Sequence, residues 1–268
     1  MASDNSFAGS IPDIYDNTLV PLIFEPYAND LAHRLTAFRP ANILEVAAGT
    51  GVVTRAMAKA LPESRIVATD LNQPMLDRAA SRQKQNERLS WRQADALALP
   101  FENQSYDAVV CQFGAMFFPD KVKAYREARR VLTARGLFLF NVWDEISSNE
   151  FADTVTRALA EMFPDDPPLF MARTPHGYRD STEIAAQLRE AGFGTVQVER
   201  IEARSRADTP RAVAIAYCQG TPLRNEIIDR RPAALNAATD LAAEAIAKRF
   251  GGGPVDGKIC ALVVTAMP

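Results

Sequence analysis

Short apolar runs alternate with helical patterns through the first half of the chain. The expected strands are NILEVA (42–47), RIVATD (65–70), LSWRQAD (89–95), YDAVVCQF (106–113) and GLFLFNVW (136–143). Apolar residues at helical spacing predict helices over 52–61, 73–83 and 121–132. Apolar runs of this kind are typical of strands buried on both faces of a parallel sheet. Strands that alternate with helices predict right-handed crossovers and a sheet covered by helices.

The alternation breaks after Asp144. One helical pattern is followed by the loop FPDDPPLFMARTPHGY, and its prolines predict a surface connection or a lid over 163–179. Asp180 and Gly192 bracket a capped helix, and TVQVERIEA (195–203) alternates as a strand. An alanine-rich helical stretch over 209–250 then leads to a last strand, KICALVVTA (258–266). A strand reached after so long an excursion is expected to pair with the sheet already formed.

Composition and charge narrow the function classes. The 268 residues are 47% hydrophobic and 24% charged, as in an ordinary soluble globular protein, and the net charge of −3 gives no basic surface for nucleic acid. The N-terminus has no signal-peptide pattern, and no apolar run reaches the ~18 residues of a membrane span. The three cysteines have neither metal-site nor disulfide spacing. We therefore expect a cytoplasmic protein with buried reduced thiols, no membrane span, no nucleic-acid partner and no metal.

The stretch NILEVAAGTGVVT joins a strand to a helix through a glycine turn. Gly49 and Gly51 allow a ligand close to the backbone, and the following helix offers free N–H groups. The dinucleotide pattern G-x-G-x-x-G is incomplete, because Thr54 stands at its third glycine. Glu45, at the strand end, would repel a pyrophosphate and attract an ammonium or sulfonium group. S-adenosylmethionine combines such a cationic group with a carboxylate and a ribose.

LEVAAGTG resembles the first motif of the class I S-adenosylmethionine-dependent methyltransferases, of the small-molecule type grouped as methyltransferase type 11. Ala47 stands where that motif often has its first glycine. The resemblance is strong over about residues 40–145. It implies an α/β, Rossmann-like, doubly wound and mostly parallel seven-stranded sheet with an antiparallel last strand, plus a helical cap or insertion. The expected parts are an N-terminal helical cap segment (1–39), the cofactor-binding core (40–204) with the lid loop (163–179), a helical insertion (205–257) and a final core strand (258–268).

Three further motifs follow in the order of that family. The resemblance assigns Asp70 to the two ribose hydroxyls, Asp95 with the Ala96 amide to the adenine, and a carbonyl at Cys111 or Gln112 to the methionine amino group. Asp70 and Asp95 could instead cap local turns, and Glu45 could be a surface acid. The expected cofactor-binding residues are Glu45, Ala47, Gly49, Thr50, Gly51, Asp70, Leu71, Met75, Asp95, Ala96, Cys111, Gln112 and Tyr15.

The methyl acceptor is expected to meet apolar residues after the fourth strand and in the lid. These substrate candidates are Phe113, Met116, Phe117, His176 and Tyr178. Core packing is the alternative for the aromatic cluster and for Tyr15. His176 is a candidate general base or a residue with only local hydrogen bonds, and no catalytic residue is assigned.

The predicted activity is methyl transfer from S-adenosylmethionine to a small, partly apolar organic acceptor by in-line displacement, in a monomer or homodimer. The first half also resembles quinone-precursor C-methyltransferases, although the helical insertion does not follow their pattern. A non-catalytic S-adenosylmethionine-binding protein and a nicotinamide-dependent oxidoreductase are the rival predictions. Because this fold hosts many chemistries, the sequence leaves the acceptor and the atom that is methylated open.

Overall fold

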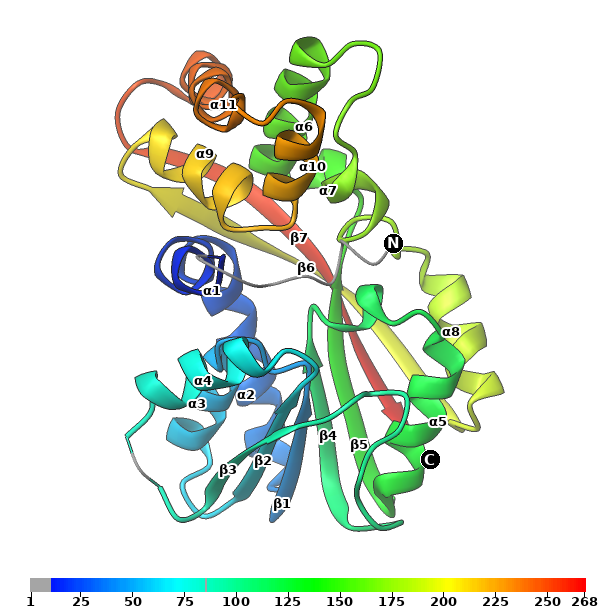
Figure 1. Cartoon of the computed structure of the whole chain (residues 1–268). Helices are drawn as coiled ribbons and strands as arrows, with labels where there is room; N and C mark the ends of the chain where they lie inside the picture. Colours follow the sequence, from blue (N-terminus) through cyan, green and yellow to red (C-terminus); the bar gives the residue numbers. More distant parts are fainter. Residues whose placement is uncertain (1–10, 85) are drawn as a thin grey trace. The chain divides into compact units, whose positions relative to one another are not determined.

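The computed structural model describes residues 11–84 and 86–268 (Figure 1). The chain forms two compact units. Unit 1 comprises the residues up to Pro26, Trp143–Tyr178 and Glu202–Cys260, and unit 2 comprises Tyr27–Val142, Arg179–Ile201 and Ala261–Pro268. The first ten residues of the predicted N-terminal cap lie outside the described residues.

One sheet contains all seven predicted strands. The strands are β1 (Asn42–Val46), β2 (Arg65–Asp70), β3 (Leu89–Gln93), β4 (Tyr106–Gln112), β5 (Leu132–Trp143), β6 (Thr195–Ala207) and β7 (Val255–Met267). Their order is β3-β2-β1-β4-β5-β7-β6, with parallel pairing from β3 through to β5. The last strands of the chain are antiparallel, which confirms the predicted fold class. Each of β6 and β7 contributes residues to both units.

Unit 2 packs helices on the parallel strands. They are α2 (Glu25–Phe38), which begins in unit 1, α3 (Val52–Ala60), α4 (Gln73–Arg82), the 3-10 helix η2 (Ala115–Phe117), α5 (Lys121–Val131) and α8 (Ser181–Glu190). Apolar positions at helical spacing on α2 and α3, such as Leu31, Leu35 and Met57, are buried with strand residues such as Ile43 and Val110. Burial of this stripe fixes the first helices on the sheet and so places the turn between β1 and α3.

Unit 1 is mainly helical. It contains α1 (Ile11–Ile14), the π-helix η1 (Tyr15–Phe24), η3 (Ile146–Ser148), α6 (Glu150–Met162), α7 (Phe170–Arg173), α9 (Pro210–Gln219), α10 (Leu223–Arg230) and α11 (Leu235–Phe250). Helix α11 packs on α9 and α6, and α9 packs on η1. The predicted insertion is therefore helical, but it shares a compact unit with residues 143–178, which we had placed in the core.

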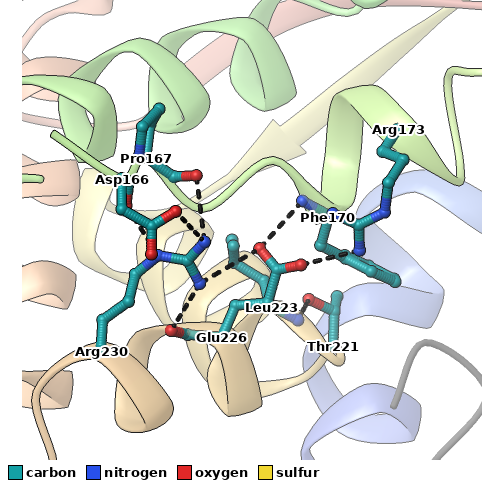
Figure 2. A network of polar contacts seen from close by, with 8 residues as sticks. All are labelled: Asp166, Pro167, Phe170, Arg173, Thr221, Leu223, Glu226 and Arg230. Carbon is teal, nitrogen blue, oxygen red and sulfur yellow. Dashed lines mark hydrogen bonds and ion pairs between the residues drawn. The ribbon is translucent and has the colours of Figure 1, made fainter. Parts of the chain in front are cut away.

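The predicted lid loop is tied down within unit 1 (Figure 2). Glu226 of α10 accepts hydrogen bonds from the Phe170 amide at 3.2 Å and from Arg173 at 2.7 Å. Arg230 donates to the carbonyl of Asp166 at 2.7 Å and to that of Pro167 at 3.2 Å. Phe170 is also buried. The loop is thus a packed connection, because its aromatic and charged side chains find partners on α10 and around it. Its role as a lid stays a prediction.

Candidate functional site

The carboxyl ends of the central strands gather the predicted cofactor residues at one edge of unit 2. The parallel ladders pair Val46 with Thr69, Asp70 with Gln93, and Gln112 with Asn141. Strand β1 has β2 on one side and β4 on the other, so the strand order reverses there. In open parallel sheets, ligands bind beyond the strand ends at such a reversal.

The turn after β1 has the backbone of a ligand cradle. Gly49 (φ 55°) and Gly51 (φ 79°) adopt the left-handed conformation that glycine tolerates. A Cβ on Gly51 would also lie 2.8 Å from the Trp91 ring. Thr50 is buried, and its Oγ1 has no hydrogen-bond partner among the described residues. This hydroxyl and the free N–H groups at the start of α3 are the donors that a ligand carboxylate needs.

The ends of β1 and β4 touch. Ala47 has φ 55°, which is strained for a residue with a Cβ, and it stands where the resemblance suggested glycine. A Cβ added to Gly114 would lie 2.5 Å from the Ala47 Cβ and 2.8 Å from the Cys111 Sγ. Residue 114 therefore has to be glycine, because Ala47 and Cys111 leave no room for a Cβ there.

Gly114→Ala is expected to destabilise the fold by about 1–3 kcal/mol, because these contacts force the strand ends apart. Adding Ala47→Gly should recover part of that loss, since it removes the nearest atom and relaxes the backbone at 47. Urea unfolding of both single variants and the double variant measures the coupling. Strictly additive free energies of unfolding would show that the two residues do not press on each other.

Asp70 connects the end of β2 to the glycine turn. Its Oδ2 accepts from the Gly49 amide and its Oδ1 from the Asn72 amide, both at 2.8 Å. The side chain is only 7% exposed; burial raises the pKa of Asp70, and these hydrogen bonds oppose the rise. Leu71, the next residue, is 52% exposed, which is unusual for leucine. An apolar surface thus lies directly beside a carboxylate.

Glu45 departs from expectation. We predicted a carboxylate open to a cationic ligand, but the side chain is 1% exposed and accepts a hydrogen bond from the Thr54 hydroxyl of α3. Burial is the main cause that raises the pKa of Glu45 to about 8, against the opposing effects of Thr54 and Arg55. The strand direction turns this side chain inward, so in this structure Glu45 joins β1 to α3 and does not face solvent as a charge.

Asp95 lies in a short turn after β3. Its Oδ1 accepts from the Leu97 amide at 2.9 Å, the local turn that we weighed as the alternative. The following loop is clamped by α5, because Glu127 accepts from the Leu99 amide and Arg130 donates to the Leu99 and Phe101 carbonyls. Ala96 is half-buried beside Asp95. These contacts hold the segment after β3 in place at the same edge.

The residues after β4 are mostly buried. Cys111 is fully buried and burial raises its pKa to about 12, so its thiol is not a nucleophile near neutral pH. Gln112 ends the strand. Phe113 has φ 49°, and its ring meets Tyr27 edge-on at 5.4 Å. Met116 is buried and Phe117 half-buried, so core packing accounts for much of this cluster.

The remaining candidates belong to unit 1. Tyr15 stacks on Phe24 with ring centroids 5.1 Å apart, and Tyr178 is buried. His176 is 2% exposed, with Nδ1 2.8 Å from the Asp144 carbonyl. Because a carbonyl only accepts, the Nδ1 atom that faces it carries the proton. His176 is thus a buried histidine with a local hydrogen bond, which agrees with the alternative that we weighed for it.

A separate cavity of about 590 Å³ lies near the start of β5, lined by residues that include Arg126, Arg129, Arg130 and Leu132. Leu132 is the first residue of β5, so this cavity is at the opposite strand ends from the glycine turn. Arg130 is already bound to Glu127 and to loop carbonyls. The cavity therefore lies outside the candidate cofactor site.

The described residues contain neither a metal-site cluster nor a membrane-spanning helix. In this part of the chain, no three His, Cys, Asp or Glu side chains gather as a metal site. No helix within 11–84 or 86–268 has the length and apolar character needed to cross a membrane.

Three residues that shape the candidate site were not predicted from the sequence. They are Asn72, which holds Asp70; Gly114, which contacts Ala47; and Asn141 on β5, whose Oδ1 accepts from the Phe113 amide at 2.9 Å. Asn141 could have been noticed in the sequence, since it is the one polar residue in the apolar run FLFNVW. The role of Gly114 depends on a contact between two strand ends and has no comparable signal, whereas the Asn72 contact is a local turn two residues after Asp70.

Comparison with known proteins agrees with this geometry. A family profile described as a methyltransferase domain matches residues 43–136. A mitochondrial 2-methoxy-6-polyprenyl-1,4-benzoquinol methylase from Caenorhabditis elegans is 28% identical over 174 residues, which are 60% of this chain and 61% of that protein. A malonyl-[acyl-carrier protein] O-methyltransferase from Geobacter sulfurreducens is 31% identical over 166 residues, or 59% of this chain and 58% of that protein.

The fold is shared more widely than the sequence. The crystal structure of the YcgJ protein from Bacillus subtilis has a TM-score of 0.57 and 19% identity, covering 89% of this chain and 97% of that one. The chain spans less than two thirds of the length of the two curated relatives above. The matched domain and these relatives show that residues 43–136 are similar to methyltransferase domains, and the likeness to the YcgJ structure shows that the fold is shared.

Proposed function

We propose that this chain binds S-adenosylmethionine at the carboxyl edge of β1, β2 and β4 and transfers its methyl group to a small, partly apolar organic acceptor. One arrangement carries the proposal. The Asp70 carboxylate is hydrogen-bonded to the left-handed glycine turn at Gly49 and stands beside the exposed Leu71, at the point where the strand order reverses.

The chain's own groups fit the parts of this cofactor. Thr50 Oγ1 and the amides at the start of α3 suit a carboxylate. Asp70 still has a lone pair for a ribose hydroxyl on Oδ2, which accepts from the Gly49 amide, whereas Oδ1 accepts from both the amide and the Nδ2 of Asn72. Leu71 offers an apolar surface to a base ring. When bound, the cofactor supplies a methyl group on a cationic sulfur, and the protein then has to orient the acceptor and exclude water.

The residues after β4 suit the acceptor side of such a site. Phe113, Met116 and Phe117 remain the proposed acceptor contacts, because apolar side chains at the strand end favour a partly apolar ligand. The inert Cys111 thiol argues against a covalent enzyme intermediate at that position. Tyr15 remains a proposed contact of the cofactor's methionine carboxylate, His176 and Tyr178 remain proposed acceptor contacts, and His176 remains the candidate base.

The relatives leave the acceptor atom open. The name of one specifies a benzoquinol methylase, and the name of the other specifies O-methylation of a malonyl group on a carrier protein. We therefore propose the class of acceptor and not its identity. An acceptor screen with labelled S-adenosylmethionine, followed by mass spectrometry of the product, tests transfer directly; cofactor binding without any methylated product would favour the non-catalytic alternative.

S-adenosylhomocysteine is expected to raise the melting temperature, whereas NAD is not. A ligand at 100 times its Kd stabilises the native state by about 2.7 kcal/mol, which for a chain of this size is roughly 5 °C or more. The turn favours the first ligand, because Thr54 replaces the third glycine that a dinucleotide motif requires. Differential scanning fluorimetry provides the measurement. A clear rise with NAD and none with S-adenosylhomocysteine would overturn the proposed function in favour of an oxidoreductase.

A further inference from the structure

Asn141 is a buried polar residue in the middle of an apolar strand. Its neighbours on β5, Phe140 and Val142, are fully buried, and Asn141 itself is 0% exposed. An asparagine in such a place loses the hydrogen bonds that water would give it. A buried asparagine therefore needs hydrogen-bond partners that compensate for this loss.

The first partner is the backbone of Phe113. The Phe113 amide donates both to the Asn141 carbonyl at 3.1 Å and to the Asn141 Oδ1 at 2.9 Å. Gln112 and Asn141 are the last pair of the β4–β5 ladder, so Asn141 holds the first residue beyond it. Phe113 has φ 49°, a conformation that a bulky side chain keeps only when its surroundings enforce it. Asn141 supplies that restraint.

The effect of this restraint extends to the glycine turn. Gly114 follows Phe113, and a Cβ there would lie 2.5 Å from the Ala47 Cβ. Ala47 is itself left-handed and begins the turn that contains Gly49. A hydrogen bond from β5 thus fixes the end of β4, and the end of β4 lies close against the start of the candidate cofactor turn.

The other half of the Asn141 side chain is unused. Its Nδ2 is buried and has no hydrogen-bond partner within the described residues. Asn149 shows the contrast, because its Nδ2 donates to the carbonyls of Asp144, Glu145 and Cys260 and its Oδ1 accepts from the Cys260 amide. Buried amides are normally satisfied in this way, so an unmatched donor next to a ligand edge points to an acceptor brought from outside.

We propose that Asn141 is a positioning residue of the cofactor edge. Its Oδ1 holds Phe113 in the left-handed conformation, and its Nδ2 donates to an oxygen atom of the ligand bound there. The second half of this proposal rests on the proposed function, whereas the first half does not. An amide suits both tasks at once, because it has an acceptor and a donor on one rigid group.

Two substitutions separate the two tasks. Asn141→Leu removes both, so the Phe113 amide should exchange roughly 10-fold faster and the Kd for S-adenosylhomocysteine should rise roughly 10-fold or more. Asn141→Asp keeps an oxygen for the Phe113 amide, so exchange there should stay within about 3-fold of wild type. At pH 8 it should still bind S-adenosylhomocysteine roughly 10-fold more weakly, and the difference from wild type should shrink at lower pH as the new carboxyl gains a proton and can donate.

Hydrogen exchange resolved at residue 113 and titration calorimetry at pH 6 and 8 provide the readouts. Asn149→Asp is the matched control, because it disturbs a buried asparagine that is fully bonded; it should lower the melting temperature and leave the Kd unchanged. If Asn141→Leu loses only melting temperature, like this control, the positioning role is overturned. If the wild-type protein does not bind S-adenosylhomocysteine at all, the proposed function fails together with the Nδ2 contact, while exchange at Phe113 still decides whether Asn141 holds the turn.

Discussion

Asp70→Ala is expected to weaken S-adenosylhomocysteine binding roughly 10-fold or more, because a carboxylate that accepts ribose hydroxyls contributes about 1.5–3 kcal/mol for each hydrogen bond to a charged group. Titration calorimetry measures the change. The structure adds a second effect, since the Gly49 and Asn72 amides lose their acceptor. We therefore expect the melting temperature to fall as well, and the titration should be made where the variant is still folded.

Asp77→Asn is the matched control for Asp70. Asp77 lies on α4, where its exposed carboxylate accepts from Gln73. Removing that charge should change neither the affinity nor the fold appreciably. If Asp70→Ala lowers the melting temperature while calorimetry gives the wild-type affinity, then Asp70 only ties β2 to the glycine turn, and the ribose contact proposed for it is wrong.

Glu45→Gln is expected to change how stability depends on pH. The pKa of Glu45 rises from an ordinary 4.5 to about 8 in the folded protein. Between these values the unfolded chain has released a proton that the folded chain keeps, so the free energy of unfolding of the wild type falls as pH rises through this window. The full effect is on the order of 5 kcal/mol, and a glutamine at 45 does not titrate.

Urea unfolding at pH 5, 6, 7 and 8 tests this expectation. The stability of Glu45→Gln relative to wild type should increase steadily from pH 5 to 8, while contributions from Asp70 and other acids largely cancel in the comparison. Two parallel pH profiles would show that Glu45 is already ionised in the folded protein. A carboxylate in contact with a cationic ligand, as we first expected, would then again be the better description.

The elements that position the site could be predicted because their signals are local. The runs NILEV and RIVATD are apolar and bounded by turns, and they became β1 and β2 with nearly the expected limits. Asp180 caps its helix as predicted, since its Oδ1 accepts from the Thr182 and Glu183 amides. The parallel sheet followed from the alternation of strands and helices, which leaves few topologies, whereas the order of the strands was known only from the structure.

The direction of single side chains was harder to predict. Glu45 and His176 both looked available to a ligand in the sequence, yet both are buried with partners inside their own units. Sequence position says that a residue ends a strand or lies in a loop, but not which face the side chain takes. The contacts of the loop at 163–179 could not be predicted for the same reason, because Glu226 and Arg230, which bind it, lie more than fifty residues later.

The sequence by itself determined the fold class, because the hydrophobic period and the glycine turn at Gly49 and Gly51 act over a few neighbouring residues. Only the tertiary structure decided the fine geometry of the edge: Asp70 on the Gly49 amide, Gly114 against Ala47, and Asn141 on the Phe113 amide. Each of these contacts joins different strands across 21 to 67 residues of sequence. Such contacts form only when parallel pairing has brought the strand ends together, so no local sequence pattern predicts them.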